Sequence, residues 1–363
     1  MIRRPLLLAS ALLAALGLSG CKEEPAAPQA AATPAAESFQ WKMVTAWPKN
    51  YPGLGTAAER LAERVKTMSN GRLSIKVYAG GELVPPLEVF DAVSRGTAEL
   101  GHGAAYYWKG KVPAAQFFTA VPFGLSTSEM NAWLSKGGGQ ALWDEAYAPY
   151  GVKPLVVGNT GMQMGGWYNK EINALDDLKG LKIRMPGLGG EVLSRLGATT
   201  VNLPGGEVFT ALQTNAIDAT DWVSPYNDLA FGLHKAAKFY YYPGWQEPQA
   251  VLELLINQKA LDSLPADLQA ILTEAARAAS QDMLDDYVYH NALALAELKQ
   301  QGTLLKRFPD EVLAAMQHES TLVLGELAAQ SELNGRIWAS MQAFQAQVSQ
   351  MHQVSEKELY DWR

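Results

Sequence analysis

Arg184 ends a short predicted strand at a position where it could bind an anion. The strand follows a turn at Gly180, and Pro186 and Gly187 break the backbone pattern directly after it. A guanidinium at such a point can hold a carboxylate through two parallel hydrogen bonds. An ion pair at the protein surface is the alternative role, and the local sequence leaves both open.

Two loops rich in tyrosine, tryptophan and small polar residues follow predicted strands, at 103–108 (GAAYYW) and 220–227 (TDWVSPYN). Each stands beside one copy of an internal echo, because the pattern of 89–99 (VFDAVSRGTAE) returns 119 residues later at 208–218 (VFTALQTNAID). This spacing favours two similar α/β lobes, with chance likeness between helix–turn–strand junctions as the alternative. Open α/β sheets bind ligands beyond the carboxyl ends of their strands, so both loops are predicted to line a site.

Other chemistries have no matching motif. The patterns G-x-S-x-G, H-E-x-x-H, Walker A and G-x-G-x-x-G do not occur, and the glycine run at 187–190 lacks the third glycine of a dinucleotide site. The histidines never stand three or four residues apart, so a histidine-based metal site has no local support. The five histidines are His102, His234, His290, His318 and His352.

The N-terminal residues predict export and a lipid anchor. Residues 1–20 combine the basic pair Arg3 and Arg4 with an apolar run over 6–18 that is too short to span a bilayer, which is typical of a signal peptide. The sequence Leu-Ser-Gly-Cys that follows the run resembles the bacterial lipobox, so we expect Cys21 to be acylated and to hold the protein at a membrane. A chance cysteine after a signal peptide is the alternative.

Cys21 is the only cysteine, and its acylation would exclude disulfides, thiol catalysis and cysteine metal sites. Residues 21–38 contain three prolines and seven alanines, and they are predicted to form a flexible tether. The expected product is therefore a periplasmic, membrane-tethered lipoprotein.

Composition and charge exclude several classes of protein. Of the 363 residues, 48% are hydrophobic and 18% are charged, which indicates a globular protein rather than a disordered, collagen-like or disulfide-scaffold chain. Lysine and arginine number 30 against 37 aspartates and glutamates, so the net charge is −7. A chain with this balance and no basic patch repels polyphosphate, and we expect no nucleic-acid partner.

From about Phe39 onward, strand and helix patterns alternate, which predicts the α/β fold class. The clearest patterns are strands over 40–47, 73–77 and 152–157, and helices over 57–68, from Pro86 to Gly96, and after a capping box of Ser126 and Glu129.

The C-terminal region is predicted to be helical, over 265–301 and again from Pro309 past Gln345. The first of these helices would be about 55 Å long, which is longer than one lobe. We expect one of the two to cross to a second copy of the chain and to bury Trp338, Met341 and Phe344 there. A brace between the two lobes of one chain is the alternative.

Several segments resemble the substrate-binding proteins of tripartite ATP-independent periplasmic (TRAP) transporters, of the dicarboxylate-binding-protein type. The resemblance covers about residues 40–350 and is carried by KVYAGGEL (76–83), QMGGWY (163–168), LKGLKIRMPG (178–187) and NAIDATDW (215–222). Within that family, DWVSPYNDLAFG (221–232) and YYYPGWQEP (240–248) are similar to the branch that binds 2-oxoacids such as pyruvate together with a sodium ion.

The resemblance implies a two-lobed periplasmic-binding-protein clam-shell, type II-like, with long C-terminal bracing helices and one organic anion in the cleft. Lobe I is expected to consist of 39–158 plus about 249–285. Lobe II is expected to consist of 159–248 plus about 286–363, including the C-terminal helices.

The resemblance also implies the roles of the site residues. The expected substrate-binding residues are Tyr106, Gln163, Arg184 and Asp221, and the expected cation ligands are Gln163, Asp221, the carbonyl of Trp222, and Glu247. Arg184 would hold the carboxylate of the substrate. All the cation ligands are oxygen donors, which suits sodium, with calcium as the second candidate. For Asp221 and Glu247, a pair of solvated loop carboxylates is the alternative.

The expected function is capture of a small monocarboxylate, a 2-oxoacid such as pyruvate or the related lactate, and its delivery to the membrane subunits of a TRAP permease without covalent chemistry. The alternative is an exported metal-dependent hydrolase or lyase that uses Asp221 and Glu247 as an acid–base pair. A purely structural lipoprotein is the third class, and the two polar aromatic loops argue against it.

Overall fold

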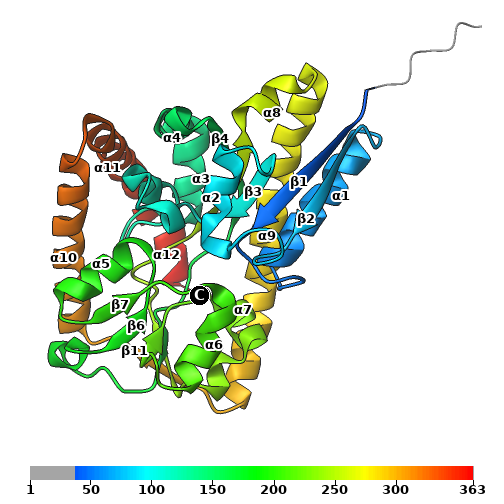
Figure 1. Ribbon diagram of the computed structural model, residues 1–363. Helices are drawn as coiled ribbons and strands as arrows, with labels where there is room; N and C mark the ends of the chain where they lie inside the picture. Colours follow the sequence, from blue (N-terminus) through cyan, green and yellow to red (C-terminus); the bar gives the residue numbers. More distant parts are fainter. Residues whose placement is uncertain (1–36, 363) are drawn as a thin grey trace, which may run out of the picture. The chain divides into compact units, whose positions relative to one another are not determined.

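The chain forms two mixed β-sheets (Figure 1). In the computed structural model, which describes residues 37–362, sheet A has the order β2-β1-β3-β10-β4 and sheet B the order β11-β9-β5-β8-β6-β7. The predicted α/β fold class is thereby confirmed. From Ser38 onward the chain forms one compact unit. The predicted signal peptide (1–20), the predicted anchor at Cys21 and all but the end of the predicted tether (21–38) lie outside the described residues.

The strands of both sheets are short. Sheet A contains β1 (Phe39–Thr45), β2 (Leu73–Tyr78), β3 (Leu100–Gly103), β4 (Val152–Asn159) and β10 (Val251–Asn257). Sheet B contains β5 (Gly166–Tyr168), β6 (Lys182–Arg184), β7 (Thr199–Val201), β8 (Ala219–Thr220), β9 (Phe239–Tyr242) and β11 (Leu304–Arg307). The three strands predicted over 40–47, 73–77 and 152–157 correspond to β1, β2 and β4.

Helices pack around the sheets, and the predicted capping box is confirmed at α3, where the Ser126 amide donates to Glu129 Oε2 at 2.8 Å. The α-helices are α1 (Leu54–Met68), α2 (Val89–Ser94), α3 (Thr127–Lys136), α4 (Gly139–Tyr147), α5 (Gly187–Arg195), α6 (Gly205–Gln213), α7 (Pro225–Phe231), α8 (Gln258–Ser263), α9 (Ala266–Gln300), α10 (Asp310–Ala329), α11 (Glu332–Gln353) and α12 (Glu356–Tyr360). Short 3₁₀ helices are η1 (Pro86–Glu88), η2 (Ala105–Trp108), η3 (Pro113–Phe118), η4 (Ala148–Tyr150), η5 (Leu175–Leu178) and η6 (Leu233–Lys235). Within 37–362, none of the helices has the length and apolarity needed to cross a membrane.

The two sheets repeat one topology. In sheet A, β1 runs parallel to β2 and β3, and β10 lies antiparallel between β3 and β4. In sheet B, β6 runs parallel to β7 and β8, and β5 lies antiparallel between β8 and β9. The predicted internal echo is confirmed, because its two copies form a helix and the turn that leads into β3 and into β8, at equivalent places in the two sheets. Both copies turn through the left-handed region, at Gly96 (φ 75°) and Asn215 (φ 58°).

Helix α9 connects the two sheets along one side of the protein (Figure 1). Its 35 residues span about 52 Å, and it packs on α1 and β4 of sheet A and on α7 beside sheet B. The helix predicted over 265–301 is thus confirmed, and it braces both sheets within one chain.

The helix predicted from Pro309 past Gln345 is in fact two helices, α10 and α11. The break follows from local capping: Ser331 Oγ accepts from the Asn334 amide at 3.1 Å, and Asn334 Nδ2 donates to the carbonyl of Leu327 at 2.9 Å. The strand β11, between α9 and α10, was not predicted.

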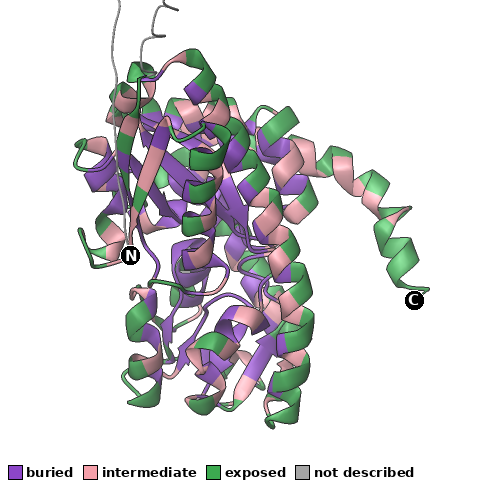
Figure 2. Cartoon of the chain, turned by 90° about the vertical axis from the view of Figure 1, so that its right-hand side faces the viewer, coloured by how far each residue is buried: buried purple, intermediate pink, exposed green. Residues whose placement is uncertain are grey.

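Residues of the same chain bury Met341, so its expected burial against a second copy is wrong. Trp338 and Phe344 are half-buried by the same chain, and their burial against a second copy stays a prediction. Met341 is 1% exposed, and the Trp338 ring stacks on Phe117 with ring centres 6.1 Å apart. Phe344 lies against Gly137 of the same chain. Figure 2 shows that the end of α11 and α12 instead extend away from the other helices with mostly exposed or half-buried surfaces.

Candidate functional site

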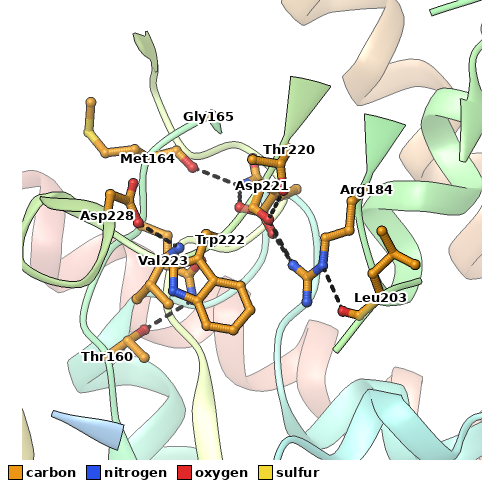
Figure 3. A network of polar contacts seen from close by, with 12 residues as sticks. Thr160, Met164, Gly165, Arg184, Leu203, Thr220, Asp221, Trp222, Val223 and Asp228 are labelled. Atoms are coloured by element: carbon orange, nitrogen blue, oxygen red, sulfur yellow. Dashed lines mark hydrogen bonds and ion pairs between the residues drawn. The ribbon is translucent and has the colours of Figure 1, made fainter. Parts of the chain in front are cut away.

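Arg184 lies at the carboxyl end of β6, which has a strand on either side. Only 1% of the residue is exposed, so the alternative of a surface ion pair is wrong. Nη1 donates to the backbone oxygen of Asp221 at 2.7 Å and Nε to that of Leu203 at 3.4 Å (Figure 3). Nη2 donates to the Tyr107 hydroxyl at 3.4 Å. These bonds use three of the five N–H groups of a guanidinium and leave two for an anion.

Asp221 directly follows β8, the parallel neighbour of β6, and is 0% exposed. Its Oδ1 accepts from Gln246 Nε2 at 2.9 Å. Its Oδ2 lies 3.8 Å from Arg184 Nη1, which is too far for a hydrogen bond. Burial raises the pKa of Asp221 to about 6, although the Arg184 charge and the Gln246 hydrogen bond lower it.

Glu247 is 2% exposed and lies in the loop between β9 and β10. Its backbone oxygen accepts from the Gln163 amide at 3.2 Å, which joins this loop to the one between β4 and β5. Burial and then the charge of Asp221 raise the pKa of Glu247 well above its usual range, while Arg184 and Tyr106 lower it. The alternative of two solvated loop carboxylates is therefore wrong for both Asp221 and Glu247.

Gln163, Trp222 and Tyr106 are also buried. Gln163 Nε2 donates to Thr160 Oγ1 at 3.3 Å, so the amide has a fixed direction. The Trp222 ring centre lies 5.0 Å from Arg184 Cζ, a cation–π contact. Tyr106 comes from η2 beside sheet A and lies against Gly187 at the start of α5 beside sheet B. All six residues predicted for the site thus have buried positions around one region of the chain.

Three of the expected cation ligands carry a buried side-chain oxygen that has no hydrogen-bond partner among the described residues. These atoms are Gln163 Oε1, Asp221 Oδ2 and Glu247 Oε2. Leaving a buried acceptor unpaired costs about 1–3 kcal/mol, and more for a charged group. A hard cation bound to these oxygens would satisfy them, so the donor set fits sodium or calcium.

Residues 37–362 contain no cluster of three or more histidine, cysteine, aspartate and glutamate side chains that could bind a metal. A cation at this place would therefore need amide and backbone oxygens besides the two carboxylates, which is the composition expected from the sequence.

Two cavities flank Tyr106 and Tyr107, and both are lined from the two sheets. The smaller, of about 10 Å³, is lined by Trp47, Leu54, Tyr106, Tyr107, Thr160, Gln163, Trp222, Val223, Ala250 and Leu252. The larger, of about 460 Å³, is lined by the two tyrosines, by Lys109 and Gly110, and by residues of 185–202. The smaller cavity is mostly apolar, adjoins Gln163 and has room for about one water-sized group.

Asp228, on α7, holds the backbone beside the site. Its Oδ1 accepts from the Val223 amide at 3.2 Å (Figure 3). Its Oδ2 accepts from Trp167 Nε1 at 2.9 Å and from the Tyr240 hydroxyl at 2.6 Å. Burial raises the pKa of Asp228 to about 7 despite these hydrogen bonds. The carboxyl group thereby fixes the direction of the chain directly after Trp222.

Sequence reasoning missed Gln246 and Asp228, and it placed Tyr107 in a site-lining loop without its contact to Arg184. Tyr107 stands next to Tyr106 in the first polar aromatic loop, and Gln246 stands next to Glu247, so both lie inside segments that the sequence singled out. Nothing in their type or spacing separates them from neighbours that point elsewhere. Their roles depend on the contacts with Arg184, Asp221 and Val223 described above.

Comparison with known proteins identifies a family with this arrangement. Residues 43–331 match the model of bacterial extracellular solute-binding protein, family 7, known as DctP. A protein of Nostoc sp. (strain PCC 7120), described as a monocarboxylate 2-oxoacid-binding periplasmic protein, is 46% identical over 321 residues, covering 88% of this chain and 87% of the relative.

Solved structures of TRAP periplasmic solute-binding proteins superpose closely on this chain. One from Colwellia psychrerythraea, with bound calcium and pyruvate, has a TM-score of 0.88 and 42% identity, covering 90% of this chain and 100% of its own. One from Pseudoalteromonas atlantica, with bound sodium and pyruvate, has a TM-score of 0.87 and 42% identity, covering 90% and 99%. The predicted two-lobed binding-protein fold is thereby confirmed.

Proposed function

Since the chain belongs to the DctP family, family 7 of the bacterial extracellular solute-binding proteins of TRAP transporters, we propose that it captures a short 2-oxoacid such as pyruvate together with a sodium or calcium ion. The observation that carries the proposal is the set of buried, unpartnered oxygens on Gln163, Asp221 and Glu247 beside the Arg184 guanidinium. The family is one of solute-binding proteins rather than enzymes, which excludes the alternative of a metal-dependent hydrolase or lyase.

In this proposal Arg184 holds the carboxylate of the substrate with its two remaining N–H groups. Its bonds to Asp221, Leu203 and Tyr107 fix the guanidinium before the substrate arrives, so little conformational freedom is lost on binding. The Trp222 ring covers one face of the guanidinium and keeps water from it. Tyr106 approaches the same anion from the side of sheet A.

The cation would be held by Gln163, Asp221, the Trp222 carbonyl and Glu247. When bound, it supplies the positive charge that allows an anion to lie beside two carboxylates. Gln246 occupies Oδ1 of Asp221 and so leaves Oδ2 as the oxygen of that carboxylate directed to the site.

Two lobes closing on the anion would account for a site lined from both sheets. The strands of sheet A fall within 39–159 and 251–257, and those of sheet B within 166–242 and 304–307, which supports lobe boundaries near 158 and 249. The proposed boundary near 286 falls inside α9. The proposed role continues with delivery of the substrate to the membrane subunits of a TRAP permease, from a periplasmic position tethered through Cys21.

Isothermal titration calorimetry tests the proposal. The purified protein, dialysed against a choline buffer with chelator, is titrated with pyruvate after addition of sodium, of calcium, or of neither. We expect binding with a cation and loss of at least tenfold in affinity without one. Absence of pyruvate binding in all three buffers would overturn the proposal. Mass spectrometry of any ligand retained on purification then identifies the acid.

A further inference from the structure

We propose that Tyr51 is a positioning residue that ties the cation-binding segment of the sheet B side to the sheet A side. Tyr51 lies between β1 and α1, and it is buried. Its hydroxyl accepts from Trp222 Nε1 at 2.8 Å and donates to the backbone oxygen of Asn227 at 2.7 Å. Both partners belong to the segment after β8 of sheet B. The role in ligand binding rests on the proposed function.

The contact between Tyr51 and the segment 222–227, here called the joint, contains further polar contacts between the sheet A side and the sheet B side. Asn227 Nδ2 donates to the carbonyl of Pro52 at 2.7 Å, and Asn227 Oδ1 accepts from the Tyr287 hydroxyl on α9. Each hydrogen-bonding atom of the Asn227 side chain is thus paired with the sheet A side or with the helix that connects the sheets. Asn227 itself is fully buried.

Ring packing reinforces these hydrogen bonds. The Tyr51 ring lies on Phe231 with centres 4.2 Å apart, and Phe231 lies on Trp222 with centres 4.9 Å apart. On its other side Trp222 covers the Arg184 guanidinium, with its ring centre 5.0 Å from Cζ. One continuous set of contacts therefore leads from Tyr51 to the group proposed to hold the carboxylate, although Tyr51 itself is not among the residues proposed to touch ligand.

This arrangement has a kinetic consequence. The bonds of Tyr51 to Trp222 and Asn227 form only while the two sides are together, so they stabilise the closed protein and not the open one. A ligand that enters the open protein and leaves only after reopening would dissociate faster without them, whereas its association rate would change little. The Tyr51 hydroxyl makes two buried hydrogen bonds, each worth about fivefold, so their loss is expected to accelerate dissociation at least tenfold.

Stopped-flow fluorescence with pyruvate in sodium buffer tests this on the full chain. Tyr51→Phe keeps the ring packing and removes the hydroxyl, and we expect dissociation at least tenfold faster with association within about twofold of the wild type. Tyr150→Phe is the matched control, because its hydroxyl also donates to a backbone oxygen at 2.7 Å, that of Lys111, but within the sheet A side alone. The control is expected to leave both rates unchanged.

Trp222→Phe provides a second variant, which removes the N–H donor and keeps an aromatic ring over Arg184. If the Tyr51–Trp222 bond carries the effect, the double variant should dissociate no more than about twofold faster than the faster single variant. Unchanged dissociation in Tyr51→Phe, or full multiplication of the two single effects, would overturn the proposal. Should either single variant not fold, the other is compared with Tyr150→Phe alone.

Amide hydrogen exchange of the ligand-free protein separates failure of this proposal from failure of the proposed function. The ligand-free protein protects these amides only while it is closed, so Tyr51→Phe, which lowers the closed fraction, should accelerate exchange in 50–54 and 221–228 relative to Tyr150→Phe, whether or not pyruvate is the ligand. Pyruvate binding with unchanged exchange and dissociation would contradict the joint alone. Faster exchange in a protein that binds no 2-oxoacid would contradict the proposed function alone.

Discussion

Arg184 and Asp221 exchange two hydrogen bonds that involve their backbones rather than forming a closed ion pair. Nη1 of Arg184 donates to the Asp221 carbonyl at 2.7 Å, and the Asp221 amide donates to the Arg184 carbonyl at 2.9 Å. The carboxylate itself stays 3.8 Å from Nη1. The guanidinium and the carboxylate thus lie close together without a hydrogen bond between them. Each therefore remains able to bind an incoming ion.

Replacing Arg184 by lysine should weaken pyruvate binding at least tenfold. The lysine retains the charge but loses the planar fork and the brace to Leu203 and Asp221. Titration calorimetry in sodium buffer measures the effect. Arg195→Lys is the control, since this arginine pairs with Glu326 at the surface and should leave affinity unchanged. Equal affinities in wild type and Arg184→Lys would contradict the assignment.

Replacing Asp221 by asparagine should raise the sodium concentration needed for half-maximal pyruvate binding about tenfold. Asparagine keeps an oxygen donor and loses the charge, and linkage requires the anion to bind less tightly as well. Pyruvate affinity is measured in sodium, in calcium and in choline with chelator. Asp176→Asn, which removes an exposed carboxylate paired with Lys179, is the control. The assignment fails if wild-type affinity is the same in all three buffers.

The pH dependence of stability should report the buried Asp228. Its pKa is raised to about 7 from 3.8, so its contribution to folding is fully present below pH 3.8 and is lost as the pH rises through about 7. For the ligand-free protein, this group alone should lower the free energy of unfolding by about 4 kcal/mol across that range.

Urea denaturation of ligand-free protein between pH 4.5 and 8, in the wild type and in Asp228→Asn, measures this contribution. The fall in stability with rising pH should be smaller in the variant. Parallel pH profiles for the two proteins would show that Asp228 does not titrate as its burial implies.

The expected dimer remains a prediction, and the structure adds the end of the chain, residues 351–362, as a surface for its contact. Large side chains at the end of the chain are strongly exposed, with Met351 at 63%, Val354 at 74% and Trp362 at 83%. Such a group on one extended segment favours an interface with a second copy. Multi-angle light scattering at tens of micromolar should give a dimer, and removal of residues 351–363 should give a monomer. A wild-type monomer would refute the prediction.

Short sequence patterns predict many elements of the fold. Alternation of apolar and polar residues identified β2, the Ser126–Glu129 box identified α3, and the echo of 89–99 in 208–218 identified the two related sheets. The break between α10 and α11 was missed because it depends on a single capping serine within an uninterrupted helical pattern, at Ser331. β11 was missed because its two lysine or arginine residues and two leucines give no clear alternation until it pairs with β9.

For the site, the sequence predicted the residue types but not their burial. The types of Arg184, Asp221 and Glu247 could be matched to a binding role through their segments, but their burial could not, because charged residues in loops are usually solvated. Their burial results from strands β6, β8 and β9 ending at the same edge, which is a tertiary property. Gln246 acquires its role through that same convergence, and Tyr107 acquires its role because η2 of the sheet A side lies against Arg184.

The central position of β10 in sheet A bears on how the protein folds. β10 separates β3 from β4 and is fully buried up to Asn257, yet the chain reaches it only after all but one strand of sheet B has been made. Until residue 257 is available, β3 and β4 each present an unpaired edge, so the first 160 residues cannot close their own sheet. Pairing between strands so far apart in the sequence slows folding. A chain that ends before β10 would keep the unpaired edges of β3 and β4 and would tend to aggregate.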